Sequence, residues 1–325
     1  MTSFSDGVYQ FGGSPVGLPI TYGTGEGKGP GKVFFVNPTS GSNSNKGTTM
    51  EKPFATPAYA YTQVTSNRHD VIALSANAAH AATDELAVTK NRVHFWGLDA
   101  VGRYYGQRSR WTMGVTAGTA IAIVQNTGVG NTWSNIKFDS SDTLSTSIYA
   151  FAEGGEYTVL EHCELYKSTD LDQTGAAELL MNGDSPLIRK CTIGSLVNAI
   201  SGAILRPCVL VTATIAGKKA RDVMFEECLL WRKCGDTGNR FVYGANATDV
   251  ERMFLMKKCV FVNAKLAAAV PAQNVAFGAT QTEGEVLLWD CTSLNAATAM
   301  STTTGVFVDS PVPAAATSGI SVQAS

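Results

Sequence analysis

The chain repeats one short pattern of apolar and polar positions five times. VLEHCELY, LIRKCTIG, MFEECLLW, FLMKKCVF and VLLWDCTS each contain an apolar pair, one or two polar residues and then a cysteine, at position 163, 191, 228, 259 or 291. The cysteines are 28, 37, 31 and 32 residues apart. Repeats of about 20 to 50 residues are typical of solenoids, in which each unit forms one coil.

Short strand-like runs closed by Gly, Asn or Asp fill the units, and no helical period is present. Further runs of this kind occur upstream at 70–76, 85–89, 92–98 and 120–126. Leucine-rich repeats fit less well, because their L-x-x-L-x-L-x-x-N phrase is missing. We therefore expect an all-β chain that forms a right-handed parallel β-helix solenoid over residues 70–310.

The recurrent cysteine predicts an internal ladder at one bend, because equivalent residues of successive coils stack about 4.8 Å apart. Asn135, in WSNIKFDS, is assigned to the same slot one unit earlier. The predicted structural ladder consists of Asn135, Cys163, Cys191, Cys228, Cys259 and Cys291. A metal strip or a chain of disulfides is the alternative, but stacked thiols lack the converging geometry of a tetrahedral site, and seven cysteines without a C-x-x-C pair suit buried thiols. We expect no metal and no cofactor.

The two ends of such a solenoid need covers, because open sheet edges recruit other chains. FATPAYAYTQVTSN predicts a short capping helix, since Thr56 can cap it and Pro57 suits its first position. Residues 32–69 are thus assigned to an initial strand, a turn and this helix. Residues 1–31 are rich in Gly and Pro and predict an extended arm, and residues 311–325 predict a C-terminal tail.

Composition excludes several classes of partner. Charged residues make up only 16% of the chain and the formal net charge is −2, so we expect neither a nucleic-acid nor a membrane partner. No run of about 18 apolar residues is present, and MTSFSDGVYQFGGSP does not have the pattern of a signal peptide.

One stretch between predicted coils, DAVGRYYGQRSRWTMG, gathers arginines and aromatic residues. This combination is typical of contact hot spots, although a loop whose aromatic side chains cover the core is the alternative. The candidate interface residues are Arg103, Tyr104, Tyr105, Arg108, Arg110 and Trp111 in this stretch, and Phe4, Tyr9, Phe11 and Tyr22 in the arm.

No catalytic residue is assigned from the sequence. The carboxylates considered for a hydrolytic pair are Asp170, Asp172, Glu178, Asp184, Glu226 and Glu227. A pair on adjacent coils would suit glycoside hydrolysis, but solvated turn residues are the preferred interpretation. The four histidines form no constellation in the sequence, and no G-x-S-x-G phrase is present. We expect the protein not to be an enzyme.

Residues 32–64, followed by 70–74, resemble the opening of many pectate-lyase-like right-handed parallel β-helix proteins, in which a strand, a turn, a KPFAT phrase, a short helix and the first coil strand follow one another. The matching residues are Val36, Asn37, Gly41, Ser42, Asn43, Gly47, Lys52, Pro53, Phe54, Ala55 and Thr56. Within this group the whole chain is most similar to virion surface proteins of tailed bacteriophages, of the capsid decoration or cement type.

This resemblance implies a structural protein of the capsid surface that is synthesised in the host bacterial cytoplasm. It implies a homotrimer that contacts the major capsid protein, with weak glycan binding left open. The alternative is a tailspike or fibre protein that binds or hydrolyses a host surface polysaccharide.

Overall fold

Three parallel sheets make up almost the whole of the described chain. The computed structural model describes residues 31–99, 109–113, 120–140, 149–167, 175–197, 200, 205–213, 215, 217–235, 237–264, 271–278, 280–294, 296–297 and 299–310. Within these residues there are one α-helix and 25 strands. Each coil contributes one strand to each sheet in turn, and the next coil repeats the order. The predicted fold, a right-handed parallel β-helix, is confirmed.

The strands of each sheet lie in the order of their coils. Sheet A contains β1 (Val33–Val36), β2 (Val71–Leu74), β5 (His94–Gly97), β8 (Thr132–Ser134), β11 (Val159–Glu161), β14 (Leu187–Arg189), β17 (Ala220–Glu226), β20 (Val250–Lys257), β23 (Glu283–Trp289) and β25 (Val306–Asp309). Sheet B contains β3 (His80–Ala82), β6 (Arg110–Met113), β9 (Lys137–Ser140), β12 (Glu164–Lys167), β15 (Thr192–Gly194), β18 (Leu229–Arg232), β21 (Val260–Asn263) and β24 (Thr292–Leu294). Sheet C contains β4 (Leu86–Val88), β7 (Val124–Asn126), β10 (Tyr149–Glu153), β13 (Ala177–Met181), β16 (Val209–Val211), β19 (Val242–Gly244) and β22 (Val275–Phe277).

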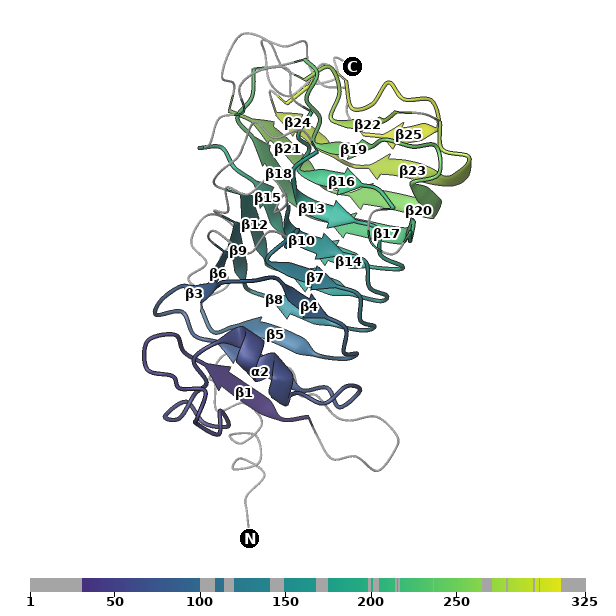
Figure 1. Ribbon diagram of the computed structural model, residues 1–325. Helices are drawn as coiled ribbons and strands as arrows, with labels where there is room; N and C mark the ends of the chain where they lie inside the picture. The colour runs from purple at the N-terminus through teal and green to yellow at the C-terminus, as the bar shows by residue number, and fades with distance from the viewer. Residues whose placement is uncertain are drawn as a thin grey trace, which may run out of the picture.

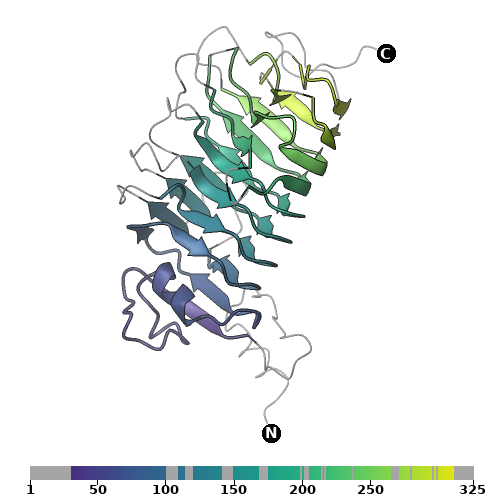
Figure 2. The same cartoon turned by 45° about the vertical axis from the view of Figure 1, so that its right-hand side comes forward.

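A short helix covers the first coil, as Figures 1 and 2 show. Helix α2 (Pro57–Gln63) starts where the sequence predicts, because the side chain of Thr56 accepts a hydrogen bond from the backbone N–H of Tyr59 at 3.2 Å. Tyr61 of this helix is buried and stacks on Phe95 of the coil beneath, with ring centroids 6.4 Å apart. The helix thus closes the apolar interior at the N-terminal end.

The core is a set of side-chain rows that run through the coils. In sheet A, one such row contains Leu160, Ile188, Phe225, Met256 and Leu288, which pair in register and are fully buried. The residues on either side of each of these point to the outer face, because side chains alternate along a strand. Each row of inward side chains is therefore flanked by rows of outward side chains that repeat once per coil in the same register.

The corner between sheets A and B is made by one residue in the left-handed region of φ in each coil. These residues are Asn135, His162, Lys190, Glu227, Lys258 and Asp290, with φ between 52° and 59°. The next residue in five of the coils is a cysteine, and its buried thiol lies against a backbone carbonyl of the preceding coil. The Cys228 Sγ, for example, is 3.3 Å from the carbonyl oxygen of Ile188. The five cysteines form one continuous row, and each thiol fills the small space inside the bend.

The assignment of Asn135 to this row is wrong by one residue. Glu164 pairs with Lys137 and Glu161 pairs with Ser134, so Ile136 is the residue that corresponds to Cys163. Asn135 instead occupies the left-handed position at the corner, with φ at 59°. Its side-chain amide donates a hydrogen bond to the carbonyl of Gly97 at 2.9 Å. An amide that bonds the backbone of the coil below suits this strained position, whereas the thiol slot takes an apolar side chain.

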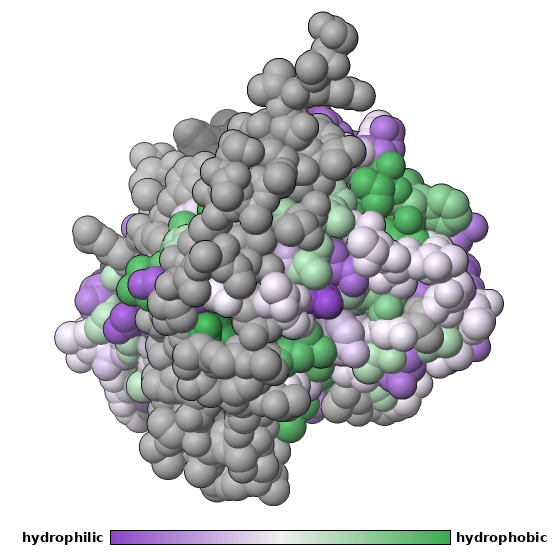
Figure 3. Space-filling model, turned by 90° about the horizontal axis from the view of Figure 1, so that it is seen from above, coloured by the Kyte–Doolittle hydropathy of each residue, from purple (hydrophilic) through white to green (hydrophobic). Residues whose placement is uncertain are grey.

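The C-terminal end of sheet A carries exposed apolar side chains. Trp289, Phe307 and Val308 are exposed on β23 and β25, and hydrophobic side chains gather on one side of this end in Figure 3. In the described part of the chain, no helix has the length and apolar character that a membrane span requires.

Candidate functional site

A row of charged residues follows the corner between sheets C and A, and we call it the charged edge: Glu156, Asp184, Arg221 and Glu251. Glu156 bridges to Asp184, and Asp184 bridges to Arg221, as isolated parallel pairs. Arg221 pairs with Glu251 where β17 meets β20. Neighbouring members are therefore one coil apart, roughly 5 Å between backbones. The edge brings together residues that are 28 to 37 positions apart in the sequence.

The residue after each edge position turns the chain into sheet A. Tyr157, Ser185, Asp222 and Arg252 have φ of 51°, 54°, 46° and 77°. Side chains at such turns project away from the solenoid, and Tyr157 is 64% exposed. The charged edge borders a surface pocket of about 280 Å³. Its lining consists of Glu156, Asp184, Gly217, Lys218, Lys219, Arg221 and Glu251.

Cations of neighbouring coils neutralise the carboxylates of this pocket. The Lys218 Nζ is 3.5 Å from Glu156 Oε1. Arg221 lies between two carboxylates, with Nη1 3.1 Å from Asp184 Oδ2 and Nη2 2.7 Å from Glu251 Oε1. The hydrogen bond and the charge of Glu251 raise the pKa of Arg221, so it remains a cation. Within the edge, Asp184, Arg221 and Glu251 alternate in charge, and their two ion pairs link three successive coils.

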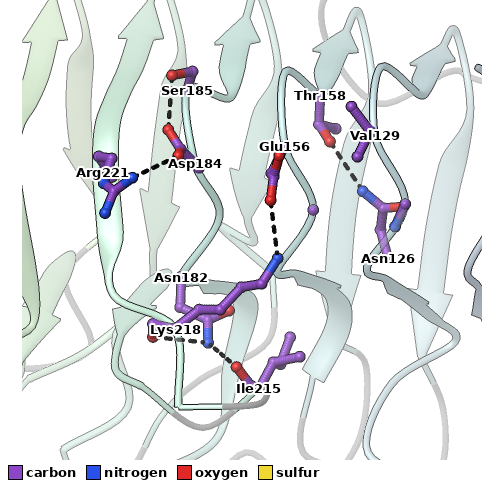
Figure 4. A network of polar contacts seen from close by, with 12 residues as sticks. Asn126, Val129, Glu156, Thr158, Asn182, Asp184, Ser185, Ile215, Lys218 and Arg221 are labelled. Carbon is purple, nitrogen blue, oxygen red and sulfur yellow. Dashed lines mark hydrogen bonds and ion pairs between the residues drawn. The ribbon is translucent and has the colours of Figure 1, made fainter. Parts of the chain in front are cut away.

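Buried amides hold the pocket in place from inside, as Figure 4 shows. The Asn182 Nδ2 donates hydrogen bonds to the carbonyls of Ile215 at 3.1 Å and Lys218 at 3.3 Å, which fixes the loop that carries Lys218. Two coils earlier, Asn126 donates to both carboxylate oxygens of Glu153, at 3.0 and 3.1 Å. Burial raises the pKa of Glu153 to about 7 despite these hydrogen bonds. Glu153 is fully buried, so it supports the corner and does not meet solvent.

This arrangement is better suited to holding coils together than to acid–base chemistry. A retaining glycosidase needs two carboxyl groups about 5 Å apart, one of them protonated near neutral pH. Glu156 and Asp184 are one coil apart, but each already pairs with a cation, Lys218 and Arg221 respectively. No group of three or more His, Cys, Asp or Glu side chains in the described residues could hold a metal ion.

The carboxylates considered from the sequence are not brought into one group. Glu178 is buried against Arg206 and Arg232, and Asp184 lies on the charged edge. Glu226 pairs with Lys257 at 3.2 Å on the outer face of sheet A, and Glu227 occupies the left-handed position before Cys228. Asp170 and Asp172 lie outside the described residues.

Of the candidate interface residues, two fall on β6. The Trp111 side chain is buried in the core between Phe95 and Phe138, with centroids 6.0 Å from each. Its expected role at an interface is therefore wrong, because the strand turns this side chain inward. Arg110 is exposed and its Nη1 lies 3.9 Å from Asp139 Oδ2. Phe4, Tyr9, Phe11, Tyr22, Arg103, Tyr104, Tyr105 and Arg108 lie outside the described residues.

Two histidines meet in the structure, although no sequence motif links them. His69 Nδ1 is 3.0 Å from His94 Nε2, and the two rings stack with centroids 5.3 Å apart. His94 Nδ1 also contacts Thr132 Oγ1 at 2.8 Å. Burial, with the charge of Arg92, lowers the pKa of His69. Burial and the neighbouring His69 lower the pKa of His94 to about 4, against the opposing charge of Asp70.

The pKa shifts of His94 and of the buried Glu153 predict opposite dependences of fold stability on pH. His94 stabilises the fold above pH 6.5, and this contribution is lost as pH falls toward 4, by about 3 kcal/mol. Glu153 stabilises the fold below pH 4.5, and this contribution is lost as pH rises toward 7, by a similar amount of about 3 kcal/mol. The melting temperature of the native chain should change little between pH 5 and 6.5, because the two contributions offset each other.

Two variants separate the contributions in scanning calorimetry. Glu153→Gln should show a melting temperature that falls steadily as pH is lowered from 7 to 5, because only the histidines remain. His94→Gln should show the reverse slope, because Glu153 then dominates. If both variants keep the pH profile of the native chain, the burial effects assigned to these two groups are incorrect.

Comparisons with known proteins agree with the architecture. No protein-family model matches the chain, and no curated protein matches it. A pectin methylesterase from Aspergillus niger, in a penultimately deglycosylated form, is similar with a TM-score of 0.50 and 12% identity over 92% of this chain and 94% of that one. Pectin methylesterase PemA from Erwinia chrysanthemi has a TM-score of 0.50 and 12% identity over 81% and 79% of the two chains. Pectate lyase Pel9A has a TM-score of 0.50 and 13% identity over 86% and 79%. At these identities the likeness shows the fold alone, a right-handed parallel β-helix.

Proposed function

We propose that this protein is a structural component of a bacteriophage virion and that it decorates the capsid surface as a cement protein. The observation that carries the proposal is the pairing of outward carboxylates with cations one coil away. On the charged edge Asp184 meets Arg221 at 3.1 Å, and on sheet A Glu161 meets Arg189 at 2.9 Å. These carboxylates connect coils, so the outer surface reinforces a stiff block.

A stiff block is what a cement protein needs, because it must hold neighbouring shell subunits at a fixed spacing. The continuous cysteine and apolar rows leave little freedom for bending between coils. In this proposal Phe4, Tyr9, Phe11 and Tyr22 of the N-terminal arm contact the major capsid protein, and Arg103, Tyr104, Tyr105, Arg108 and Arg110 add further contacts. The protein works as a homo-oligomer, for which the resemblance favours a trimer, and has no enzymatic activity.

A second candidate, a tailspike or fibre protein that binds host polysaccharide, is favoured by one observation. Tyr157, which is 64% exposed, directly follows Glu156, a lining residue of the pocket of the charged edge. An exposed aromatic face next to carboxylate acceptors suits a sugar ring with its hydroxyl donors. The likeness in fold to proteins named as pectin methylesterase and pectate lyase agrees with this candidate.

Quantitative mass spectrometry of purified phage particles tests the proposal. We expect copies in the hundreds per particle, in a fixed ratio to the major capsid protein. A few copies per particle, together with binding of the pure protein to host surface polysaccharide, would favour the tailspike candidate instead. Release of oligosaccharides from that polysaccharide would contradict the non-enzymatic role, and absence from the particle would contradict the virion role.

A further inference from the structure

The outer face of sheet A carries two straight rows of side chains that no other strand of the described chain covers. The first, which we call the apolar row, contains Val159, Leu187, Met224, Leu255 and Leu287, paired in register from coil to coil. The second, which we call the charged row, contains Glu161, Arg189, Glu226 and Lys257, two residues further along the same strands. The charged side chains are between 26% and 41% exposed, so this face meets solvent in the single chain.

The charged row has a pattern that is complementary to its own reverse. Its signs alternate as negative, positive, negative and positive, one residue per coil, with a centre between Arg189 and Glu226. Reading the row backwards exchanges every sign. A second copy, rotated by 180° so that its coils run in the opposite order, therefore places a cation opposite each anion of the first copy and an anion opposite each cation.

We propose that two copies of this chain pack face to face through sheet A, around a two-fold axis that runs parallel to the strands and passes between Arg189 and Glu226. Such an axis reverses the direction of the solenoid but keeps positions along each strand unchanged. Glu161 then lies opposite Lys257 of the second copy, and Arg189 lies opposite Glu226 of the second copy. The apolar rows face each other in the same way, with Leu187 opposite Met224.

Two further features of the row fit this packing. Within one chain, the Arg189 Nη2 is 2.9 Å from Glu161 Oε2, and the Lys257 Nζ is 3.2 Å from Glu226 Oε1. The contact between copies would join these two separate pairs into a network across the interface. Trp289 is in register with Lys257 one coil further on. The Lys257 Nζ lies 5.2 Å from the ring centroid of Trp289. Trp289 is 46% exposed and would be covered by the second copy, opposite Ser134.

The size of the face sets the expected strength of the contact. Six strands about 4.8 Å apart, each about 10 Å long, give a footprint of roughly 300 Å² per copy. Stable dimers bury about 800 Å² per partner, so this contact should be a weak one that forms at high protein concentration. Such concentrations occur when many copies gather on one surface.

Sedimentation velocity over a range of protein concentrations tests the proposal. We expect a reversible dimer whose dissociation constant rises at least tenfold in Arg189→Glu, because that change places Glu opposite Glu226 of the second copy. Lys218→Glu, a charge reversal of similar exposure in the pocket beside the charged edge, should leave the dimer unchanged. Far-UV circular dichroism confirms that each variant is folded.

The double variant Arg189→Glu with Glu226→Arg distinguishes contacts between copies from contacts within one chain. It restores opposite charges between copies, while it places like charges side by side within each chain, at positions 161 and 189 and at 226 and 257. Recovery of the dimer in the double variant is the result expected. A chain that shows no association through this face at any concentration, an association unaffected by Arg189→Glu, or a double variant as weak as the single one would each overturn the proposal.

Discussion

Replacement of Glu178 with alanine should lower the free energy of unfolding by about 3–5 kcal/mol. Glu178 lies on β13, and its carboxylate contacts two guanidinium groups from neighbouring coils. The Arg206 Nη2 is 3.2 Å from Oε1, and the Arg232 Nη2 is 2.7 Å from Oε2. All three side chains are 2% exposed or less. Removal of the carboxylate leaves two buried cations without this counter-charge, and burial of an uncompensated charge is costly.

Urea denaturation measures this effect, with two further variants as controls. Glu178→Gln keeps most of the volume and removes only the charge, so it should lose nearly as much stability as the alanine variant. Glu156→Ala removes a surface carboxylate that pairs with Lys218, and it should cost about 1 kcal/mol or less. Equal losses in Glu178→Ala and Glu156→Ala would mean that the buried triad does not hold the coils together.

Truncation of Trp133 to alanine should cost about 3–5 kcal/mol for a different reason, the loss of packing. Trp133 lies on β8 in the inward row of sheet A and is fully buried. Its ring stacks on Phe95 with centroids 5.4 Å apart and meets Phe151 edge-on at 5.0 Å. The alanine would leave a cavity at the point where three aromatic side chains meet, and the surrounding strands cannot collapse to fill it.

Trp289→Ala is the matched control, because it removes the same side chain from the outer face of sheet A. Trp289 is 46% exposed in the single chain, so its truncation should cost about 1 kcal/mol or less under dilute conditions. The midpoints and slopes of urea denaturation give the free energy of unfolding of both variants, which can then be compared with that of the native chain. A Trp133→Ala variant as stable as Trp289→Ala would contradict the inward direction of Trp133 and the register of sheet A with it.

The fold could be predicted from the sequence because one residue type recurs at one structural position. The bend between sheets A and B takes a buried apolar side chain, and five of its positions are cysteine. Thr56 and Pro57 likewise predict helix α2, because both act through local backbone geometry. Features that depend on the local geometry of one coil can therefore be recognised from sequence patterns.

Features set by alignment of side chains between coils were predicted less well. The residues around Asn135 resemble those around the cysteines, yet Ile136 is the residue in register with Cys163. Trp111 lies among arginines in the sequence, but this pattern does not show on which side of a strand the ring is buried. A shift of one residue reverses the direction of every side chain in a strand, so such errors matter.

The charged row was missed although the sequence contains a signal for it. Glu161, Arg189, Glu226 and Lys257 each precede a cysteine of the repeat by two positions. Glu156, Asp184 and Arg221 of the charged edge each precede one by seven, but Glu251 precedes Cys259 by eight because the register shifts between β17 and β20. The contact between His69 and His94 has no such signal, because it joins a turn to a strand of the next coil.

An experimental crystal structure tests the central claim, which is the coil-on-coil register. We predict that the sulfur atoms of Cys163, Cys191, Cys228, Cys259 and Cys291 form one line along the corner between sheets A and B, each one coil from the next. Glu161, Arg189, Glu226 and Lys257 should form a parallel line on the outer face of sheet A. Sulfur atoms dispersed among different sheets, or a charged row broken by a shift in register, would contradict the account.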